Sequence, residues 1–260
     1  MAVALVTGAG KRLGRAMALY LAGRGYDLAV HYASSEAEAL DVVAEAQALG
    51  RQAQAFQADL LDEAQTEALF ADVVAAFDTP VTCLVNNASL FEYDRLDTAT
   101  RQTWDRHFNS NLRAPFILTQ AMARQVPEAM RDENGERLPQ GLVVNMVDQR
   151  VRKLTPEFMT YTLAKMGLWT FTQTAALALA PHIRVNAIGP GTTLIGARQK
   201  QDHFDAQRAR SILQRGANVS DITAALGFFL DSPAVTGQLI CSDGGQHLAW
   251  QTPDIINKPG

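Results

Sequence analysis

Asp148, Tyr161 and Lys165 are the residues whose types and spacing point most directly to chemistry. A separation of four residues places the phenol of Tyr161 and the ammonium of Lys165 on one face of a helix. A neighbouring ammonium lowers the pKa of a phenol, so Tyr161 could exchange a proton near neutral pH. The pair alone is a weak signal, because this spacing more often joins a core aromatic to a solvated lysine. Asp148, which precedes Tyr161 by thirteen residues, gives the pair weight.

Further polar residues stand where predicted strands end. Residues 86–89 end one predicted strand and Asp148 ends another, while Asn111 lies in a predicted helix. Ligands of a doubly wound parallel sheet bind beyond the carboxyl ends of its strands. The sequence therefore predicts a site assembled from several strand ends.

A glycine-rich turn follows the first predicted strand, where residues 7–14 read Thr-Gly-Ala-Gly-Lys-Arg-Leu-Gly. Glycines let the backbone approach a pyrophosphate, and the next helix offers N–H donors and a favourable dipole. A plain Gly-x-Gly-x-x-Gly starting at Gly8 fails, because Leu13 stands where the third glycine should be. The spacing fits Thr-Gly-x-x-x-Gly-x-Gly with Arg12 in place of the middle glycine. We favour nucleotide binding over a turn that merely joins strand to helix.

The end of the second predicted strand discriminates between cofactors. An NAD site usually carries an acid there that holds the ribose 2′-hydroxyl, but this chain has no carboxylate before Glu36. Lys11 and Arg12 are expected nearby, where a 2′-phosphate would find cations and hydroxyls. Ser34 or Ser35 could also cap the next helix, and both roles can hold at once. The sequence therefore favours NADPH over NADH.

The elements that must position these residues alternate between short apolar strands and longer helices. Strands are predicted over residues 2–7, 27–31, 52–57, 81–86, 141–147, 183–187 and 238–242. Helices are predicted over residues 13–24, 35–49, 62–77, 103–130 and 156–180. This alternation indicates a doubly wound α/β fold, with seven parallel strands and helices on both faces. Residues 1–260 show no linker and are predicted to form a single domain.

Two polar segments are placed within that domain. Residues 132–140 are short enough for a loop, and residues 193–221, with mixed charged and apolar content, fit a mobile lid over the substrate.

Composition excludes several classes of protein. The chain has 260 residues, 47% hydrophobic and 19% charged, which excludes intrinsic disorder as its main state. A net charge of −4 without a basic stripe argues against a nucleic-acid partner. Cys83 and Cys241 lack metal-ligand spacing and indicate a reducing compartment. With no basic leader and no run of about 18 apolar residues, we expect a soluble cytoplasmic protein with neither metal nor membrane contact.

Over nearly its whole length the sequence resembles the short-chain dehydrogenase/reductase family, which implies a Rossmann-like fold. The motifs that carry the resemblance are residues 7–14, Asp59, residues 86–88, Asn111, Tyr161 with Lys165, Pro190 with Gly191, residues 236–238 and residues 243–245. Together these motifs are highly specific.

The resemblance implies a role for each matching residue. Tyr161 would be the catalytic acid and base, Lys165 would bind the nicotinamide ribose and tune Tyr161, and Asn111 would support a proton-relay water. Asp59 would contact adenine. The residues expected to bind NADP(H) are Gly8, Lys11, Arg12, Leu13, Gly14, His31, Ser34, Ser35, Asp59, Leu60, Asn87, Ala88, Ser89, Tyr161, Lys165, Pro190, Gly191, Thr192 and Thr193.

One departure from the family pattern bears on the substrate. The serine that usually precedes the tyrosine by thirteen residues is Asp148 here. A carboxylate would repel a developing alkoxide, whereas a carboxyl group can help deliver a proton to a ring nitrogen. This aspartate is similar to the hallmark of pteridine and dihydromonapterin reductases within the family. The catalytic set is therefore Asp148, Tyr161, Lys165 and Asn111.

Three further residues match that subgroup. Arg12 resembles its Lys-Arg-Leu-Gly turn, and Ser89 with Phe91 resembles its Asn-Ala-Ser-x-Phe, whose Phe stacks on the pterin. Phe91 could instead be a loop hydrophobe packed on the core, and Ser89 a turn residue. Ser34 stands where the subgroup tends to carry an arginine. The predicted substrate residues are Arg12, Ser89, Phe91, Asp148 and Tyr161.

Three functions remain open. The first is NADPH-dependent reduction of a C=N bond in a pteridine, dihydropterin or dihydrofolate-like. The second is reduction of a small ketone or 3-oxoacyl thioester, with protonated Asp148 as a donor, and the third is a non-catalytic NADPH sensor. The resemblance also implies a homotetramer that pairs the helices predicted over residues 103–130 and 156–180, because residues 161–180 carry more apolar surface than one sheet-facing stripe needs.

Overall fold

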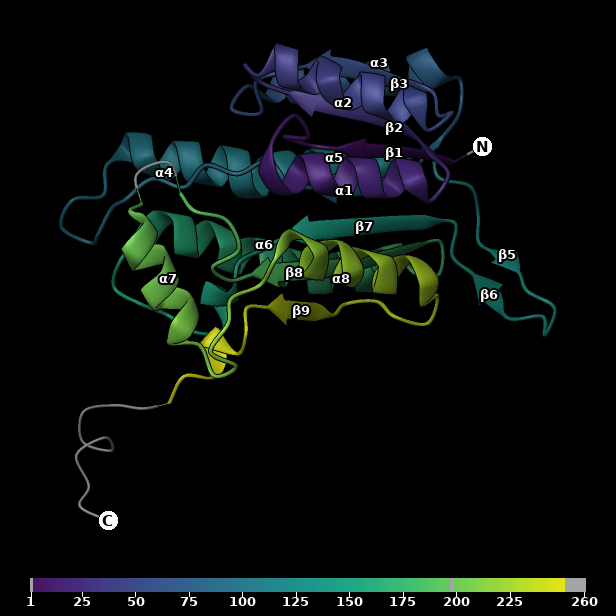
Figure 1. The fold of residues 1–260 in the computed structure, drawn as a ribbon. Helices are drawn as coiled ribbons and strands as arrows, with labels where there is room; N and C mark the ends of the chain where they lie inside the picture. Colours follow the sequence, from purple (N-terminus) through teal and green to yellow (C-terminus); the bar gives the residue numbers. More distant parts are fainter. Residues whose placement is uncertain (1, 197–198, 251–260) are drawn as a thin grey trace, which may run out of the picture.

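A seven-stranded parallel sheet forms the centre of the computed structural model, which describes residues 2–196 and 199–250 (Figure 1). The strand order β3-β2-β1-β4-β7-β8-β9 reverses direction at β1 and β4, as in a doubly wound fold. The strands are β1 (Ala2–Val6), β2 (Tyr26–Tyr32), β3 (Ala53–Gln57), β4 (Val81–Asn86), β7 (Gly141–Met146), β8 (Ile183–Pro190) and β9 (Leu239–Ser242). The prediction of an α/β fold with seven parallel strands is confirmed.

Each strand contributes side chains to two cores, one on each face of the sheet. In β1, Ala4 and Val6 pack into one core, whereas Val3 and Leu5 pack into the other, because successive side chains of a strand point to opposite faces. The first core is covered by α1 (Arg12–Gly23), α2 (Glu36–Ala48) and α8 (Val219–Asp231). The second core is covered by α3 (Glu63–Phe77), α5 (Ala114–Ala123) and α6 (Met159–Leu179). Helices on both faces are therefore confirmed.

The prediction of one long helix over residues 103–130 is wrong. Three segments replace it: α4 (Arg101–Phe108), a π-helical turn η1 (Asn109–Arg113) and α5, which ends at Ala123. Pro127 disfavours helical backbone at the residue before it, and the chain instead forms an antiparallel hairpin of β5 (Met130–Arg131) and β6 (Arg137–Leu138). The predicted loop over residues 132–140 is thus partly hairpin.

Two other predicted boundaries needed correction by several residues. Helix α6 begins at Met159 rather than at residue 156, since Phe158 adopts a left-handed backbone with φ of 57°. Strand β8 continues to Pro190 rather than ending at residue 187, because its last residues pair with β9. The remaining predicted strands and helices have bounds within one residue of those in the structure.

The segment predicted as a mobile lid, residues 193–221, contains a helix. Helix α7 (Gln201–Ala209) lies within this segment, and the last residues of the segment, 219–221, form the start of α8. Arg208 Nη1 donates to the carbonyls of Thr192 at 2.9 Å and Ala217 at 2.6 Å, which ties α7 to both ends of the segment. Residues 197–198 of the predicted lid lie outside the described residues, as do residues 1 and 251–260 of the predicted domain.

The two ends of the sheet differ in what surrounds them. Figure 1 shows α4 and α7 beyond the arrowheads of β7 and β9, whereas the β5–β6 hairpin projects at the opposite end. Strand ends, helix starts and α7 therefore gather at one end, where a doubly wound fold binds its ligands. None of the helices within the described ranges has the length and apolar character needed to cross a bilayer.

Candidate active site

Tyr161 and Asp148 meet at the carboxyl end of the sheet. Asp148 follows β7, and Tyr161 lies in the first turn of α6. The Tyr161 hydroxyl donates a hydrogen bond to Asp148 Oδ2 at 2.9 Å. The other carboxyl oxygen, Oδ1, accepts the Arg150 backbone N–H at 2.8 Å, which fixes the orientation of the carboxyl group. The structure thus joins two residues that the sequence places in the catalytic set.

Lys165 lies one helical turn after Tyr161, as the spacing predicts. Its side chain is only 2% exposed, and Nζ donates to the Met146 carbonyl at 2.7 Å. Nζ lies 5.7 Å from the centroid of the Tyr161 ring. Burial lowers the pKa of Lys165 to about 8, against the opposing pull of Asp148. The lysine is therefore close to losing its charge just above neutral pH.

The electrostatics of Tyr161 differ from the expectation. Its pKa is raised well above 10, first by burial and then by the charge of Asp148 and the hydrogen bond to it. Burial likewise raises the pKa of Asp148. The expectation that the phenol exchanges its proton near neutral pH is therefore not met in the chain by itself, because burial first and Asp148 second raise its pKa. Both groups hold their protons more tightly than they would in water.

Asn111 lies in the π-helical turn between α4 and α5, a feature often found at functional sites. Its side chain is buried and pairs with one residue: Oδ1 accepts the Leu90 N–H and Nδ2 donates to the Leu90 carbonyl, both at 2.9 Å. Asn111 thus holds the loop that carries Ser89 and Phe91. Its support of a proton-relay water stays a prediction.

An aromatic wall adjoins the Tyr161 hydroxyl. Phe91, 54% exposed, stacks on Phe158 with ring centroids 4.2 Å apart and planes 8° apart. The Phe91 and Tyr161 rings pack in a T-shaped arrangement, with centroids 4.7 Å apart and planes 76° apart. A hydrogen bond with Ser89 lowers the pKa of Tyr161, opposing the effect of burial. Three of the predicted substrate residues, Ser89, Phe91 and Tyr161, therefore lie together.

The glycine turn is tightly packed against the loop after β4. A Cβ added to Gly14 would lie 2.1 Å from the Gly8 carbonyl oxygen, and Gly8 itself has a φ of +63°. Asn87 Nδ2 donates to the Thr7 carbonyl at 2.8 Å, and the Thr7 hydroxyl accepts the N–H groups of Asn87 and Ala88 at 2.9 and 3.0 Å. Helix α1 begins there with no side-chain cap and no acid in its first turn. Its N-terminus can therefore receive an anion.

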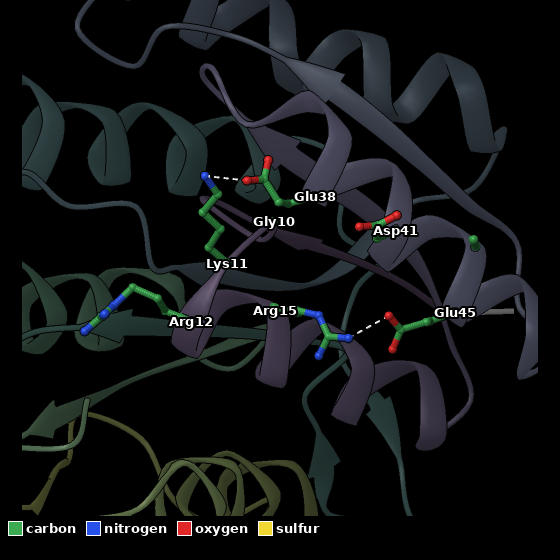
Figure 2. Close-up of a pocket in the computed structure, with 8 residues that line it drawn as sticks. Gly10, Lys11, Arg12, Arg15, Glu38, Asp41 and Glu45 are labelled. Atoms are coloured by element: carbon green, nitrogen blue, oxygen red, sulfur yellow. Dashed lines mark hydrogen bonds and ion pairs between the residues drawn. The ribbon is translucent and has the colours of Figure 1, made fainter. Parts of the chain in front are cut away.

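Lys11 and Arg12 point in different directions from this turn (Figure 2). Lys11 Nζ pairs with Glu38 Oε1 at 2.6 Å, at one side of a groove of about 610 Å³ between α1 and α2. Arg12 donates instead to the carbonyls of Leu194 and Ile195, at 3.1 and 2.8 Å. Arg12 thus reaches the predicted substrate segment, and the charge of Lys11 is already matched by an acid that the sequence reasoning did not weigh.

His31 is buried beneath the turn. Nδ1 accepts the Gly8 N–H at 3.0 Å, and Nε2 lies 3.1 Å from the Ala58 carbonyl. Burial lowers the pKa of His31 to about 4, so the ring is neutral at pH 7. His31 therefore braces the glycine turn and supplies no positive charge. Ser35 occupies the N-cap of α2, but its side chain makes no capping hydrogen bond.

The remaining predicted cofactor residues occupy two further strand ends. Asp59 is exposed after β3, where Oδ1 accepts the Leu61 N–H at 3.0 Å. Gly191 follows β8, and its N–H donates to the Ser242 carbonyl at 2.9 Å. Buried Leu60 follows Asp59, and Pro190, Thr192 and Thr193 lie around Gly191. Outside these two regions, Leu13 of α1 packs on the first core, and Ser34 is exposed after β2.

Asp94 holds the N-terminus of α6, a role the sequence reasoning missed. Its carbonyl accepts the Phe158 N–H at 2.8 Å, and Oδ1 accepts the Thr160 N–H at 3.1 Å. Its other oxygen accepts the Thr160 hydroxyl. A carboxylate at this position satisfies helix N–H groups and complements the helix dipole. No local sequence signal links residues this far apart in the chain.

His107 extends this network. Nε2 accepts the Glu92 N–H at 3.1 Å, and Nδ1 lies 2.7 Å from the Thr160 hydroxyl oxygen. Burial lowers the pKa of His107, so the neutral ring with a proton on Nδ1 donates to Thr160, which donates to Asp94. The His107 ring also meets Tyr161 edge-on, with centroids 5.9 Å apart. The directed chain therefore fixes the helix turn that carries Tyr161.

Comparisons with known proteins agree with this architecture. The family described as short chain dehydrogenase matches residues 2–206. The 3-oxoacyl-acyl-carrier-protein reductase FabG of Staphylococcus aureus is 33% identical over 250 residues, covering 94% of this chain and 98% of that protein. The structure of FolM alternative dihydrofolate reductase 1 from Brucella suis in complex with NADP is 41% identical, with a TM-score of 0.90 and 98% of each chain covered. Its counterpart from Brucella canis with NADP is 40% identical, has a TM-score of 0.88 and covers 98% of this chain and 97% of that one.

We expect Thr160→Val to lower the free energy of unfolding by about 1–3 kcal/mol, because a buried acceptor on Asp94 and a buried donor on His107 lose their partner. Displacement of Tyr161 should also reduce the turnover number by about 10- to 100-fold. Thr100→Ala is the matched control, since Thr100 caps α4 and its loss should cost about 1 kcal/mol without changing turnover. Urea unfolding and steady-state kinetics of both variants test this, and equal turnover in the two would contradict it.

Proposed function

The chain belongs to the short-chain dehydrogenase family, and on that premise we propose that it is an NADPH-dependent reductase of a C=N bond in a pteridine. The observation that carries this proposal is the 2.9 Å hydrogen bond between the Tyr161 hydroxyl and Asp148. A carboxylate next to the proton donor opposes charge on a carbonyl oxygen, but a carboxyl group whose pKa is raised can supply a proton to a basic ring nitrogen. The likeness to FolM dihydrofolate reductases in complex with NADP supports the same choice.

The glycine turn fits a dinucleotide. The contact of Gly14 with the Gly8 carbonyl leaves no room for a side chain, and the uncapped start of α1 offers N–H groups to a pyrophosphate. Lys165, fixed on the Met146 carbonyl, is placed to hold the nicotinamide ribose. When bound, the reduced nicotinamide supplies the hydride that the substrate carbon accepts.

Proton delivery falls to two residues of this chain. The Tyr161 hydroxyl and the Asp148 carboxyl share one hydrogen bond, so a proton lost from either can be replaced through the other. The ring nitrogen gains a proton as the adjacent carbon gains the hydride, which balances the reduction of C=N to CH–NH. Phe91, the exposed member of the aromatic wall, offers a face on which a flat pteridine can stack.

A carbonyl reductase is the second candidate, favoured by the 33% identity to a 3-oxoacyl reductase. In that case a protonated Asp148, whose pKa is raised by burial, would donate to the carbonyl oxygen. A non-catalytic NADPH sensor is disfavoured, because it would have no use for an ordered Tyr161, Asp148 and Lys165.

We expect Asp148→Ser to lower kcat/KM for dihydropterins by about two to four orders of magnitude, the usual contribution of a positioned acid. The same variant should gain activity on small ketones, because a serine hydroxyl stabilises a carbonyl oxygen. The loss of NADPH absorbance with dihydrobiopterin, dihydrofolate and an acetoacetyl thioester measures all three substrates. Tyr161→Phe is the control that should lose every activity. If Asp148→Ser keeps its dihydropterin turnover, or if the wild type reduces only ketones, the carbonyl reductase is correct.

The preference for NADPH over NADH should increase in Glu38→Gln. Lys11 would be released from its 2.6 Å pair with Glu38 and could meet a 2′-phosphate instead. Since exposed ion pairs contribute up to about 1 kcal/mol, we expect the ratio of kcat/KM values to rise about two- to fivefold. Glu45→Gln removes the same charge from the Arg15 pair in the same groove and should leave the ratio unchanged. A fall of the ratio in Glu38→Gln would refute this assignment of Lys11.

We also propose a homotetramer built through α4, α5 and α6. These helices expose Trp104, Phe116, Leu163 and Leu177, which are 38–83% accessible and form more apolar surface than a monomer needs. Light scattering at micromolar concentration should give four times the 28.3 kDa of one chain. Leu163→Glu should dissociate the assembly, whereas Leu96→Glu, at a leucine that is even more exposed but lies outside these helices, should not. A wild-type monomer would disprove the tetramer.

A further inference from the structure

Arg150 places a positive charge at the end of the aromatic wall. It lies two residues after Asp148, in the short 3-10 helix η2 (Gln149–Val151). Its guanidinium carbon is 4.7 Å from the Phe158 ring centroid and 6.0 Å from that of Phe91. The wall therefore runs from the Tyr161 hydroxyl, along Phe91 and Phe158, to a cation.

The charge of Arg150 has no acidic partner within residues 2–196 and 199–250. Its side chain instead donates a hydrogen bond from Nη1 to the neutral Thr155 hydroxyl at 2.9 Å. By contrast, Arg106 of α4 pairs with Glu92 of the loop after β4 at 2.7 Å. Arg150 lowers the pKa of both Asp148 and Tyr161, so its charge reaches the reacting groups. A planar guanidinium with free N–H donors suits a carboxylate, which it can bind through two parallel hydrogen bonds.

The position of Arg150 indicates the substrate as the source of that anion. The glycine turn, where a pyrophosphate would bind, follows β1, and Arg150 follows β7; strand β4 separates the two in the sheet. Phe91, the expected stacking surface for the pteridine, lies between Tyr161 and Phe158. A substituent that leaves the pteridine along the wall would therefore approach Arg150 and not the cofactor.

Resting on the proposed function, we propose that Arg150 is a specificity-determining residue that binds the carboxylate of a pterin with an acidic aromatic tail. The preferred substrate class is then a conjugated dihydropterin of the dihydrofolate type. An unconjugated dihydropterin, whose side chain carries only hydroxyl groups, would leave the guanidinium without its partner. The aromatic ring in the tail would pack on Phe158, and the carboxylate would meet the guanidinium.

The test is the steady-state kinetics of Arg150→Gln with dihydrofolate, its dimethyl ester and dihydrobiopterin, with NADPH in excess. A lost charge-assisted bidentate contact should lower kcat/KM for dihydrofolate by about 10- to 100-fold, mainly through KM. Turnover of dihydrobiopterin and of the uncharged ester should change only by the common factor that the lost charge beside Asp148 and Tyr161 causes, since neither has a carboxylate to lose, so the ratio of dihydrofolate to dihydrobiopterin activity should fall by about 10- to 100-fold. Arg150→Lys, which keeps the charge but not the planar fork, should give an intermediate value for dihydrofolate.

Arg152→Gln is the matched control, because Arg152 carries the same charge two residues later. Its guanidinium carbon lies 5.7 Å from the centroid of the Trp169 ring. This variant should leave the ratio of dihydrofolate to dihydrobiopterin activity unchanged. The proposal is overturned if Arg150→Gln lowers the dihydrofolate and dihydrobiopterin activities equally, because Arg150 then acts only through its charge near Asp148. It is also overturned if Arg152→Gln shifts the activity ratio as much as Arg150→Gln does. In both cases the proposed function stands. A wild type that reduces neither pterin would overturn the proposed function together with this inference.

Discussion

The site depends on how the N-terminus of α6 is held. A helix start leaves backbone N–H groups without partners, and here Asp94 accepts those of Phe158, Met159 and Thr160 as well as the Thr160 hydroxyl. Asp94 belongs to the loop after β4, the same loop that presents Ser89 and Phe91. The contact that satisfies the helix therefore also sets the distance between the proton donor and the aromatic wall. Because the network is buried and each of its groups is paired, it has one low-energy arrangement.

Burial shapes the chemistry as strongly as geometry does. Asp148, Tyr161 and Lys165 lie close together, and removal from water disfavours the charged form of each. The result is two acids whose pKa values are raised beside a lysine whose pKa is lowered to about 8. Such a site holds its protons more tightly than water would, so they are released only to a group that becomes strongly basic during the proposed reduction. Arg150 moderates the effect, since its charge lowers the pKa of both acids.

The sequence predicted the sheet well and the details of the site less well. Strands are short apolar runs whose pattern is local, so most of their bounds were within one residue. The prediction of one helix over residues 103–130 failed because a π-helical turn interrupts it and α5 ends at Ala123, ahead of Pro127. Motif spacing brought Tyr161, Lys165 and Asp148 together, but it could not show that Arg12 turns to Leu194 while Lys11 pairs with Glu38. Asp94, His107 and Thr160 meet only through tertiary folding, so no spacing reveals them.

Fold likeness alone leaves the substrate undecided, because one fold supports many reactions. This chain is similar over nearly its full length both to a 3-oxoacyl reductase and to FolM dihydrofolate reductases. The decision therefore rests on residues that differ from the common family pattern, above all the aspartate in place of the usual serine. Asp148 accepts a hydrogen bond from the Tyr161 hydroxyl, so the substitution acts at the proton that the proposed reaction would transfer. Two neighbouring features favour the same substrate class: Phe91 offers a face to a flat ring, and Arg150 places a cation at the end of the aromatic wall. A small ketone would use at most Asp148, whereas a pteridine with an acidic tail would use all three.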